Sequence, residues 1–255
     1  MGHTIAVAGK GGTGKTTITG LLIDTLVKQG KGPILAVDAD ANSNLNEVLG
    51  EKIENTLGEI REEINKRESN GGSFPGGMTK AQYLQYRLNT AITEGKGYDL
   101  LVMGRSEGTG CYCYVNGILR EQLDKLSDKY KYLVIDNEAG MEHLSRGTSK
   151  QIDTLLLVSD CSRRGIQAVG RISTLVKELE LKVSQQFLII NRAPEGKLEE
   201  GIFDEVSSLG LNLFGVVPLD DWVYEYDAKG KALVSLPEES ISKKTVKELC
   251  GKMGF

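Results

Sequence analysis

A glycine-rich segment near the start of the sequence has the residue types and spacing of a phosphate-binding loop. Residues 9–16 read GKGGTGKT and fit the pattern GxxxxGK[ST], between an apolar run and a helix-like stretch. Glycines let backbone N–H groups face a phosphate chain, and the positive end of the following helix adds a favourable potential. We expect Lys15 to bridge the β- and γ-phosphates, Thr16 to ligate Mg²⁺ and Thr17 to reach the α-phosphate. The sequence therefore predicts that ATP or ADP binds with Mg²⁺ to Gly11, Gly12, Thr13, Gly14, Lys15, Thr16 and Thr17.

A pair of cysteines has the spacing of metal ligands. Cys111 and Cys113 stand in the segment GCYC with one residue between them. In an extended segment, residues i and i+2 project from the same face, so both thiolates can reach one ion. A closed tetrahedral site for a soft or borderline ion needs about four ligands, and a two-fold dimer would supply two from each chain. Two buried, inert cysteines are the alternative. Cys161 and Cys250 are isolated, and we expect them to pack.

Strands and helices that could position these residues alternate along the chain. Most of the short apolar runs lack apolar/polar alternation, as expected of strands covered on both faces. The order predicts an α/β fold with a doubly wound, mostly parallel sheet flanked by helices. We interpret 1–255 as a single domain with a metal-binding loop at about 108–116, and 69–77 as a loop within it. The expected strands are 4–8, 34–37, 99–103, 132–135, 154–158, 187–190 and 213–217, and the expected helices 15–28, 55–68, 79–93, 117–125, 165–180 and 198–207.

The overall composition is that of an ordinary globular protein. Charged residues make up 26% of the 255 residues and hydrophobic residues 40%, and the formal net charge is −4. This charge gives no global field that would attract nucleic acid or an acidic membrane, so we expect neither as a partner. The sequence shows no signal-peptide pattern and no apolar stretch of membrane-spanning length, which predicts a cytoplasmic protein.

Lys10 gives the glycine-rich segment a more specific resemblance. KGGTGKTT resembles the deviant Walker A motif of the P-loop family that contains nitrogenase iron protein, MinD/ParA and arsenical-pump ATPases. In that family the additional lysine reaches across a two-fold axis to the nucleotide of the partner. The resemblance therefore implies an ATPase and a homodimer, with Lys10 and Lys15 acting in catalysis. A solvated loop lysine is the alternative for Lys10.

Two aspartates follow the second expected strand. The segment LAVDADANSN matches the first switch segment of the same family. The match implies that Asp40 orients or deprotonates the attacking water and that Asp38 belongs to the Mg²⁺ shell. Ala41 stands where related sequences often have proline, which leaves the loop less constrained and the carboxylates unchanged. Taken alone, aspartates at a strand end are common as helix caps and turn formers.

A further carboxylate is expected at the same edge of the sheet. The run 132–135 is followed by DNEAG, and an apolar strand that ends at Asp136 places this carboxylate near Mg²⁺, usually through water. Gly140 could then approach the γ-phosphate through its backbone N–H. The segment resembles the Walker B motif and second switch of the family, but many relatives have small or apolar residues at the positions of Asn137 and Glu138.

Two later segments resemble those by which the family contacts adenine. Asn191 and Arg192 follow the run FLII, and Pro218 and Leu219 follow FGVV. The resemblance implies that these four residues bind the base. An asparagine that ends a strand is also often only a turn residue.

Taken together, the motifs KGGTGKTT, VDAD, CYC and DNEAGMEHLSRGT resemble the CooC-type maturation ATPases over nearly the whole chain. This resemblance implies a metallochaperone that binds Ni²⁺, with Zn²⁺ as a competitor, between two subunits through Cys111 and Cys113. Its client would be a nickel enzyme, carbon monoxide dehydrogenase or acetyl-CoA synthase. ATP binding and hydrolysis would alter the dimer and thereby the metal site. We expect His143 to make a structural or switch hydrogen bond rather than to bind metal.

Three other functions stay open at this point. An ATPase like nitrogenase iron protein would hold a bridging [4Fe–4S] cluster, but that family uses two cysteines far apart, one of them after the second switch. A partitioning ATPase of the MinD/ParA kind would need membrane or DNA contacts, and the C-terminal segment ISKKTVKELCGKMGF is only weakly amphipathic. A nucleotide-gated metal carrier would bind ATP without turnover.

Overall fold

The computed structural model describes residues 2–40, 42–105, 128–138 and 151–255. Within them, eight strands form one sheet in the order β3-β4-β2-β5-β1-β6-β7-β8. Neighbouring strands are parallel except β3 and β4, which pair antiparallel at one edge. The α/β, mostly parallel architecture expected from the sequence is thus confirmed. The strands are β1 (His3–Gly9), β2 (Ile34–Asp38), β3 (Thr93–Glu94), β4 (Asp99–Val102), β5 (Tyr132–Asp136), β6 (Gln151–Ser159), β7 (Lys182–Ala193) and β8 (Leu213–Pro218).

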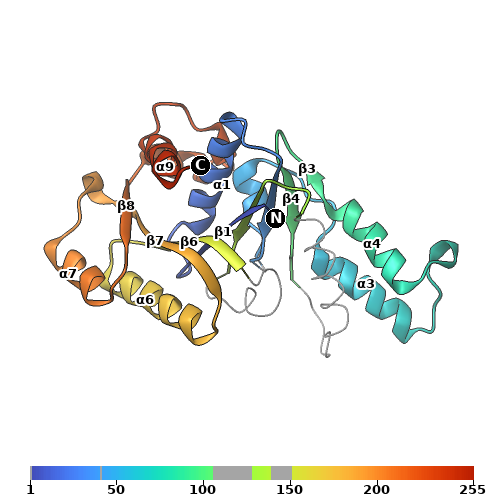
Figure 1. Ribbon diagram of the computed structural model, residues 1–255. Helices are drawn as coiled ribbons and strands as arrows, with labels where there is room; N and C mark the ends of the chain where they lie inside the picture. Colours follow the sequence, from blue (N-terminus) through green and yellow to red (C-terminus); the bar gives the residue numbers. More distant parts are fainter. Residues whose placement is uncertain (1, 41, 106–127, 139–150) are drawn as a thin grey trace.

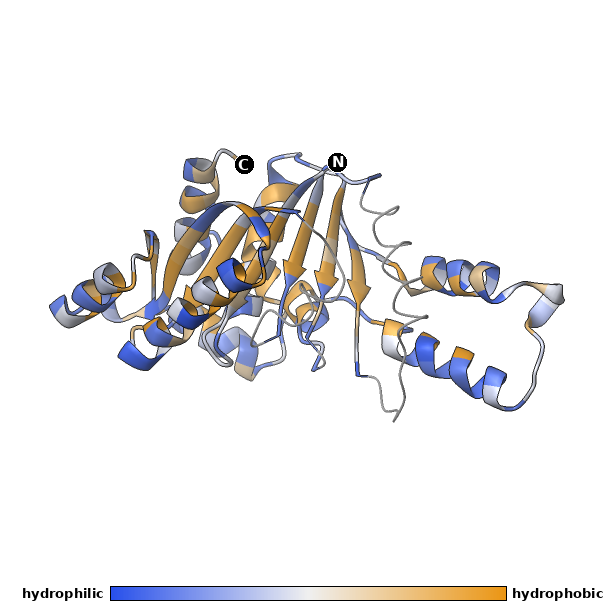
Figure 2. Ribbon diagram, turned by 60° about the horizontal axis from the view of Figure 1, so that its bottom comes forward, coloured by the Kyte–Doolittle hydropathy of each residue, from blue (hydrophilic) through white to orange (hydrophobic). Residues whose placement is uncertain are grey.

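Helices cover both faces of this sheet (Figures 1 and 2). In β1, Ile5 and Val7 join one hydrophobic core, while Ala6 and Ala8 join the other, because successive side chains point to opposite faces. The first core is completed by α1, α2 and α9, and the second by α3, α4, α6 and α7. The helices described are α1 (Lys15–Lys28), α2 (Leu45–Leu49), α3 (Leu57–Ser69), α4 (Lys80–Ala91), α6 (Arg163–Glu178), α7 (Glu200–Ser208), α8 (Asp221–Ala228) and α9 (Ile241–Met253).

Helices α3 and α4 form a hairpin that extends beyond the β3 edge of the sheet (Figures 1 and 2). Each begins with a capping box, in which the side chain of Thr56 or Thr79 accepts a hydrogen bond from the third residue of its helix. The connection between them, 70–79, overlaps the loop expected at 69–77 and contains a short 3-10 helix at Pro75–Gly77. The start of α3 lies against the end of β4, since the backbone N–H of Gly58 donates to the carbonyl of Met103 at 2.8 Å.

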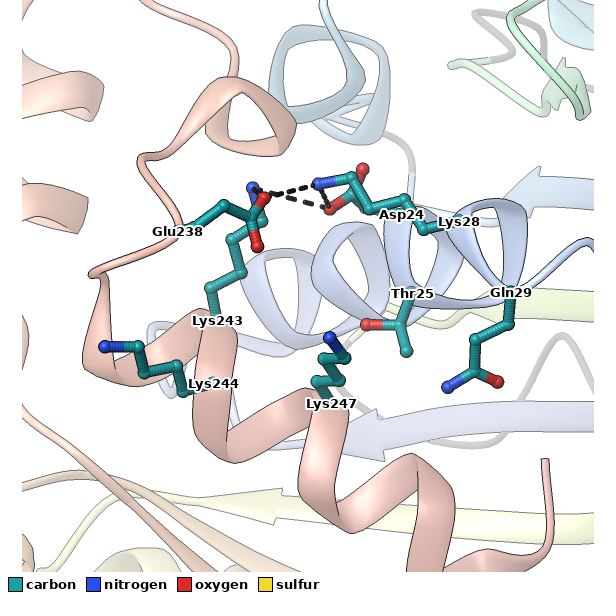
Figure 3. A pocket seen from close by; sticks show the side chains of 8 residues that line it. All are labelled: Asp24, Thr25, Lys28, Gln29, Glu238, Lys243, Lys244 and Lys247. Carbon is teal, nitrogen blue, oxygen red and sulfur yellow. Dashed lines mark hydrogen bonds and ion pairs between the residues drawn. The ribbon is translucent and has the colours of Figure 1, made fainter.

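An ionic network, with Lys243 buried and Glu238 exposed, joins the end of α1 to α9. The Lys243 ammonium is almost fully enclosed and donates to the Leu236 carbonyl at 2.7 Å. It also lies 3.0 Å from the Glu238 carboxylate and 3.7 Å from that of Asp24. Lys28 contacts the same two carboxylates, so four charged side chains converge beside a cavity of about 320 Å³ (Figure 3). The network fixes one end of the helix whose other end begins at the glycine-rich loop.

The expected strands all appear, with ends that differ by a few residues. The strand β3 and the helices α2 and α8 are not expected from the sequence. Helix α4 ends at Ala91 because the chain then turns into β3. The helix expected at 117–125 lies outside the described residues. No helix in the described part of the chain is long and apolar enough to span a membrane.

Candidate nucleotide site

The glycine-rich loop connects the end of β1 to the start of α1. Gly14 has φ +85°, a conformation that residues with a side chain rarely adopt, and a Cβ there would collide with the amide nitrogen of Asn191. Lys15 follows as the first residue of α1, so the loop ends at the positive end of that helix. Strand, turn and helix therefore stand in the order that phosphate binding requires.

Strand β7 holds this loop in shape from the side. Asn191 Nδ2 donates to the Thr13 carbonyl at 3.0 Å, and Arg192 Nη1 donates to the Gly12 carbonyl at 3.1 Å. In a trans peptide unit the N–H points opposite to the C=O. With both carbonyls turned toward β7, the N–H groups of Thr13 and Gly14 face away from that strand and are available to an anion.

A cavity of about 360 Å³, named here the phosphate cavity, opens at this loop. The Lys15 side chain is buried at its wall, and its Nζ donates to the Lys10 carbonyl at 3.4 Å. Thr13 Oγ1 donates to the same carbonyl at 2.9 Å. The phosphate cavity is lined by Gly11, Gly12, Gly14, Lys15, Thr16, Asp40, Asn42, Asn44, Glu138 and Arg192.

Two carboxylates lie buried beside this cavity at the ends of neighbouring strands. Burial raises the pKa of Asp136 to about 7, against hydrogen bonds from Thr16 and Thr19, with the nearby Asp38 adding to the rise. Burial likewise raises the pKa of Asp38 to about 6. A hydroxyl and two desolvated carboxylates form an oxygen donor set that suits Mg²⁺, whose charge would favour their ionised forms. When bound, Mg²⁺ would neutralise phosphate charge there, with Thr16 and Asp136 as the residues that hold it.

The carboxylate of Asp38 also shapes the loop that follows β2. Its Oδ1 accepts from the Asp40 N–H and its Oδ2 from the Leu45 N–H, each at 3.0 Å. Asp40 in turn accepts from the Asn42 N–H at 2.8 Å and faces the phosphate cavity. The structure thus brings Asp40 to the cavity with Lys15 and Thr16, where a carboxylate could orient a water for in-line attack. The Mg²⁺ role of Asp38 stays a prediction.

A second cavity of about 350 Å³, named here the base cavity, lies beside the first at the ends of β7 and β8. It brings together the four residues expected to bind adenine, along with Thr17. Arg192 lines both cavities, so they are adjacent. The base cavity is lined by Thr17, Asn191, Arg192, Pro218, Leu219, Asp220, Val223, Tyr224, Asp227, Leu233 and Ser242.

Some expected site residues stand apart or lie outside the described part. Lys10 is exposed and does not line the phosphate cavity, so its role toward a partner chain stays a prediction. Gly140, Cys111, Cys113 and His143 all lie outside the described residues. Among the described residues, no group of three or more His, Cys, Asp or Glu side chains could hold a metal ion.

The two remaining cysteines lie in different surroundings. Cys250 lies on α9 with its side chain buried in the core, and burial raises the pKa of its thiol to about 12. Cys161 is partly buried, and burial likewise raises the pKa of its thiol. Neither thiol has the exposed, electropositive surroundings of a reactive cysteine, so both observations fit a packing role.

Several lining residues escaped the sequence argument. Asn42 and Asn44 sit in the same segment as Asp40, and their small polar side chains gave no signal beyond that of turn formers. Tyr224 and Asp227 lie on α8, the helix that directly follows the Pro218 segment. The only sequence signal for them is the run of aromatic residues in this helix.

Comparisons with known proteins agree with this geometry. Residues 4–234 match the model of the CobQ/CobB/MinD/ParA nucleotide binding domain. A Methanocaldococcus jannaschii protein whose name gives only ATP binding is 46% identical, over 98% of this chain and 97% of its own. The carbon monoxide dehydrogenase accessory protein CooC of Rhodospirillum rubrum is 30% identical, over 91% of this chain and 89% of its own.

A solved structure shows the same fold. MinD of Pyrococcus horikoshii, complexed with Mg-ADP, superposes with a TM-score of 0.71 at 22% identity, covering 99% of this chain and 96% of its own. The region matched by the family model contains the glycine-rich loop, both buried aspartates and the whole lining of the phosphate cavity. The chain belongs to the CobQ/CobB/MinD/ParA family of nucleotide-binding P-loop proteins.

Proposed function

We propose that this chain is a homodimeric Mg-ATPase that supports insertion of nickel into carbon monoxide dehydrogenase or acetyl-CoA synthase. The observation that carries the proposal is the joint presence of a complete phosphate cavity and the pair Cys111 and Cys113 in a chain 30% identical to CooC over 91% of its length. Ni²⁺ is the cargo, and Zn²⁺ competes for the same thiolates.

Hydrolysis is supported by the position of Asp40. Its carboxylate lines the same cavity as Lys15 and Thr16, so a water held by Asp40 would lie near the γ-phosphate. Asp40→Asn should keep Mg-ATP binding and lower multiple-turnover phosphate release about 100-fold or more. Wild-type rates in this variant would refute the role of Asp40, and absence of turnover in the wild type would favour a carrier that only binds ATP.

The shared metal site is tested by stoichiometry, because two thiolates per chain cannot close a tetrahedral sulfur site while two chains can. We expect one Ni²⁺ or Zn²⁺ per two chains, and a metal-driven shift toward dimer in sedimentation. Cys111→Ser or Cys113→Ser should abolish both effects. Cys161→Ser and Cys250→Ser are the matched controls and should leave metal binding intact. One metal per chain, independent of Cys111 and Cys113, would contradict the shared site.

The same preparation separates the remaining alternatives. A coloured, iron-containing protein after anaerobic purification would favour a [4Fe–4S] cluster.

The role of Lys10 is tested by a substitution. Lys10→Ala should bind nucleotide normally but dimerise less with ATP and hydrolyse ATP more slowly, because the exposed Lys10 side chain would act on the partner's nucleotide. Unchanged dimerisation and turnover in that variant would leave Lys10 as a solvated loop residue.

A further inference from the structure

The loop that carries Asp40 is held by a side chain from a different strand. Arg105, three residues beyond β4, donates from Nη2 to the Asn42 side-chain oxygen at 2.8 Å. The backbone N–H of Asn42 donates to Asp40 Oδ1, also at 2.8 Å. The guanidinium group is therefore linked through one residue to the carboxylate that faces the phosphate cavity.

The backbone at Arg105 is firmly placed. Gly104 has φ +65°, and a Cβ there would press on the side chain of Thr56. A Cβ on Gly58 would collide with the Arg105 carbonyl, so α3 and this segment are in close contact. Met103, just before, donates from its N–H to the Asp38 carbonyl at 2.8 Å. The backbone segment 103–105, which carries Arg105, is thus in contact with both α3 and β2.

The Arg105 side chain spans an open space to reach the loop. A cavity of about 540 Å³ separates Asn42 and Ser43 from the start of α3, and Arg105 lines it. The carboxylates of Glu59 and Glu62 line the same cavity and favour a positive charge within it.

We propose that Arg105 is a positioning residue for ATP hydrolysis, which holds, through Asn42, the turn that presents Asp40 to the phosphate cavity. The inference rests on the proposed hydrolytic function. Without Arg105 the turn from Asp40 to Asn42 would lose its tie to β4 and α3, and Asp40 would spend less time in the orientation that places a water. Phosphate contacts come from the glycine-rich loop and would be unaffected.

The kinetic test is a double-mutant cycle. Arg105→Ala should lower kcat about fivefold with KM for ATP unchanged, as expected for one lost exposed hydrogen bond that acts only on positioning. Asn42→Ala should also lower kcat, and the double variant should be no slower than Asn42→Ala alone. Arg164→Ala, an exposed arginine on α6, is the matched control. A wild-type kcat in Arg105→Ala, or losses that multiply in the double variant, would overturn the proposal.

A second measurement does not depend on turnover. Hydrogen exchange of residues 39–45 should be faster in Arg105→Ala than in the wild type, with the melting temperature unchanged; equal exchange would overturn the proposal. Arg105→Gln serves in both tests if the alanine variant does not fold. Failure of the hydrolytic function itself would appear separately, as wild-type protein without turnover or as Asp40→Asn with wild-type turnover.

Discussion

The phosphate cavity and the base cavity are built in different ways. The phosphate cavity lies at the ends of three neighbouring central strands, β2, β5 and β1, and the groups around it, such as Lys15 and Asp136, are buried. The base cavity lies toward the β8 edge, where Leu219 is 56% exposed and Tyr224 78% exposed. A buried charge without its partner is costly, whereas an exposed apolar contact contributes little. Substitutions on the phosphate side should therefore have the larger effects.

The largest expected effect is the loss of nucleotide binding in Lys15→Ala. Its ammonium is the buried positive charge at the wall of the phosphate cavity, and its removal leaves the phosphate charge uncompensated. Affinity for Mg-ATP should fall about 100-fold, measured by calorimetry, since hydrogen bonds to charged groups are the strong ones. Lys177→Ala, an exposed lysine of α6, is the control. A loss below tenfold would remove the distinction between the two cavities.

The next effect concerns stability, and it follows from the raised pKa of Asp136. Because the folded state holds this proton up to about pH 7, the carboxyl destabilises the nucleotide-free protein as pH rises from about 4 to 7. Asp136→Asn should therefore stabilise that protein by about 2 kcal/mol at pH 8 in denaturant unfolding, and by little at pH 4. The same variant should lose Mg²⁺-dependent nucleotide binding.

The control for this stability effect is Asp204→Asn, at an exposed position on α7, which should change stability little at either pH. A destabilised Asp136→Asn at pH 8 would mean that hydrogen bonding outweighs the cost of burying the charge.

The smallest effect is expected on the base side. Tyr224→Ala should raise KM for ATP about threefold with kcat unchanged, because an exposed ring contributes only part of a stacking contact. Tyr86→Ala on α4, at a side chain 52% exposed and far along the chain, provides the comparison. An increase beyond 30-fold would make base recognition as important as phosphate binding, contrary to the exposure of this cavity.

The difference between the cavities also explains what the sequence could predict. Residues 9–17 form a continuous motif, so the glycine-rich loop of the phosphate cavity can be predicted from local spacing. The apolar runs predict the strands of the sheet. The hydrogen bonds from Arg192 to Gly12 and from Arg105 to Asn42 join residues that are 180 and 63 positions apart in the sequence. No local sequence pattern predicts such contacts. The short elements α2 and β3 depend on the Asp38 carboxylate and on pairing with β4, which are tertiary contacts.

The hydrogen bonds from β7 to the glycine-rich loop have a consequence for the rate of nucleotide binding. Asn191 and Arg192 fix the Thr13 and Gly12 carbonyls through hydrogen bonds that the chain makes by itself. The loop therefore has no ordering step to complete when ATP arrives, and less conformational entropy is lost on association. In stopped-flow experiments the observed binding rate should rise linearly with ATP concentration, without the plateau that a slow rearrangement imposes. The speed of nucleotide capture would then be set by diffusion into the cavities, while residence time would depend on the contacts made afterwards.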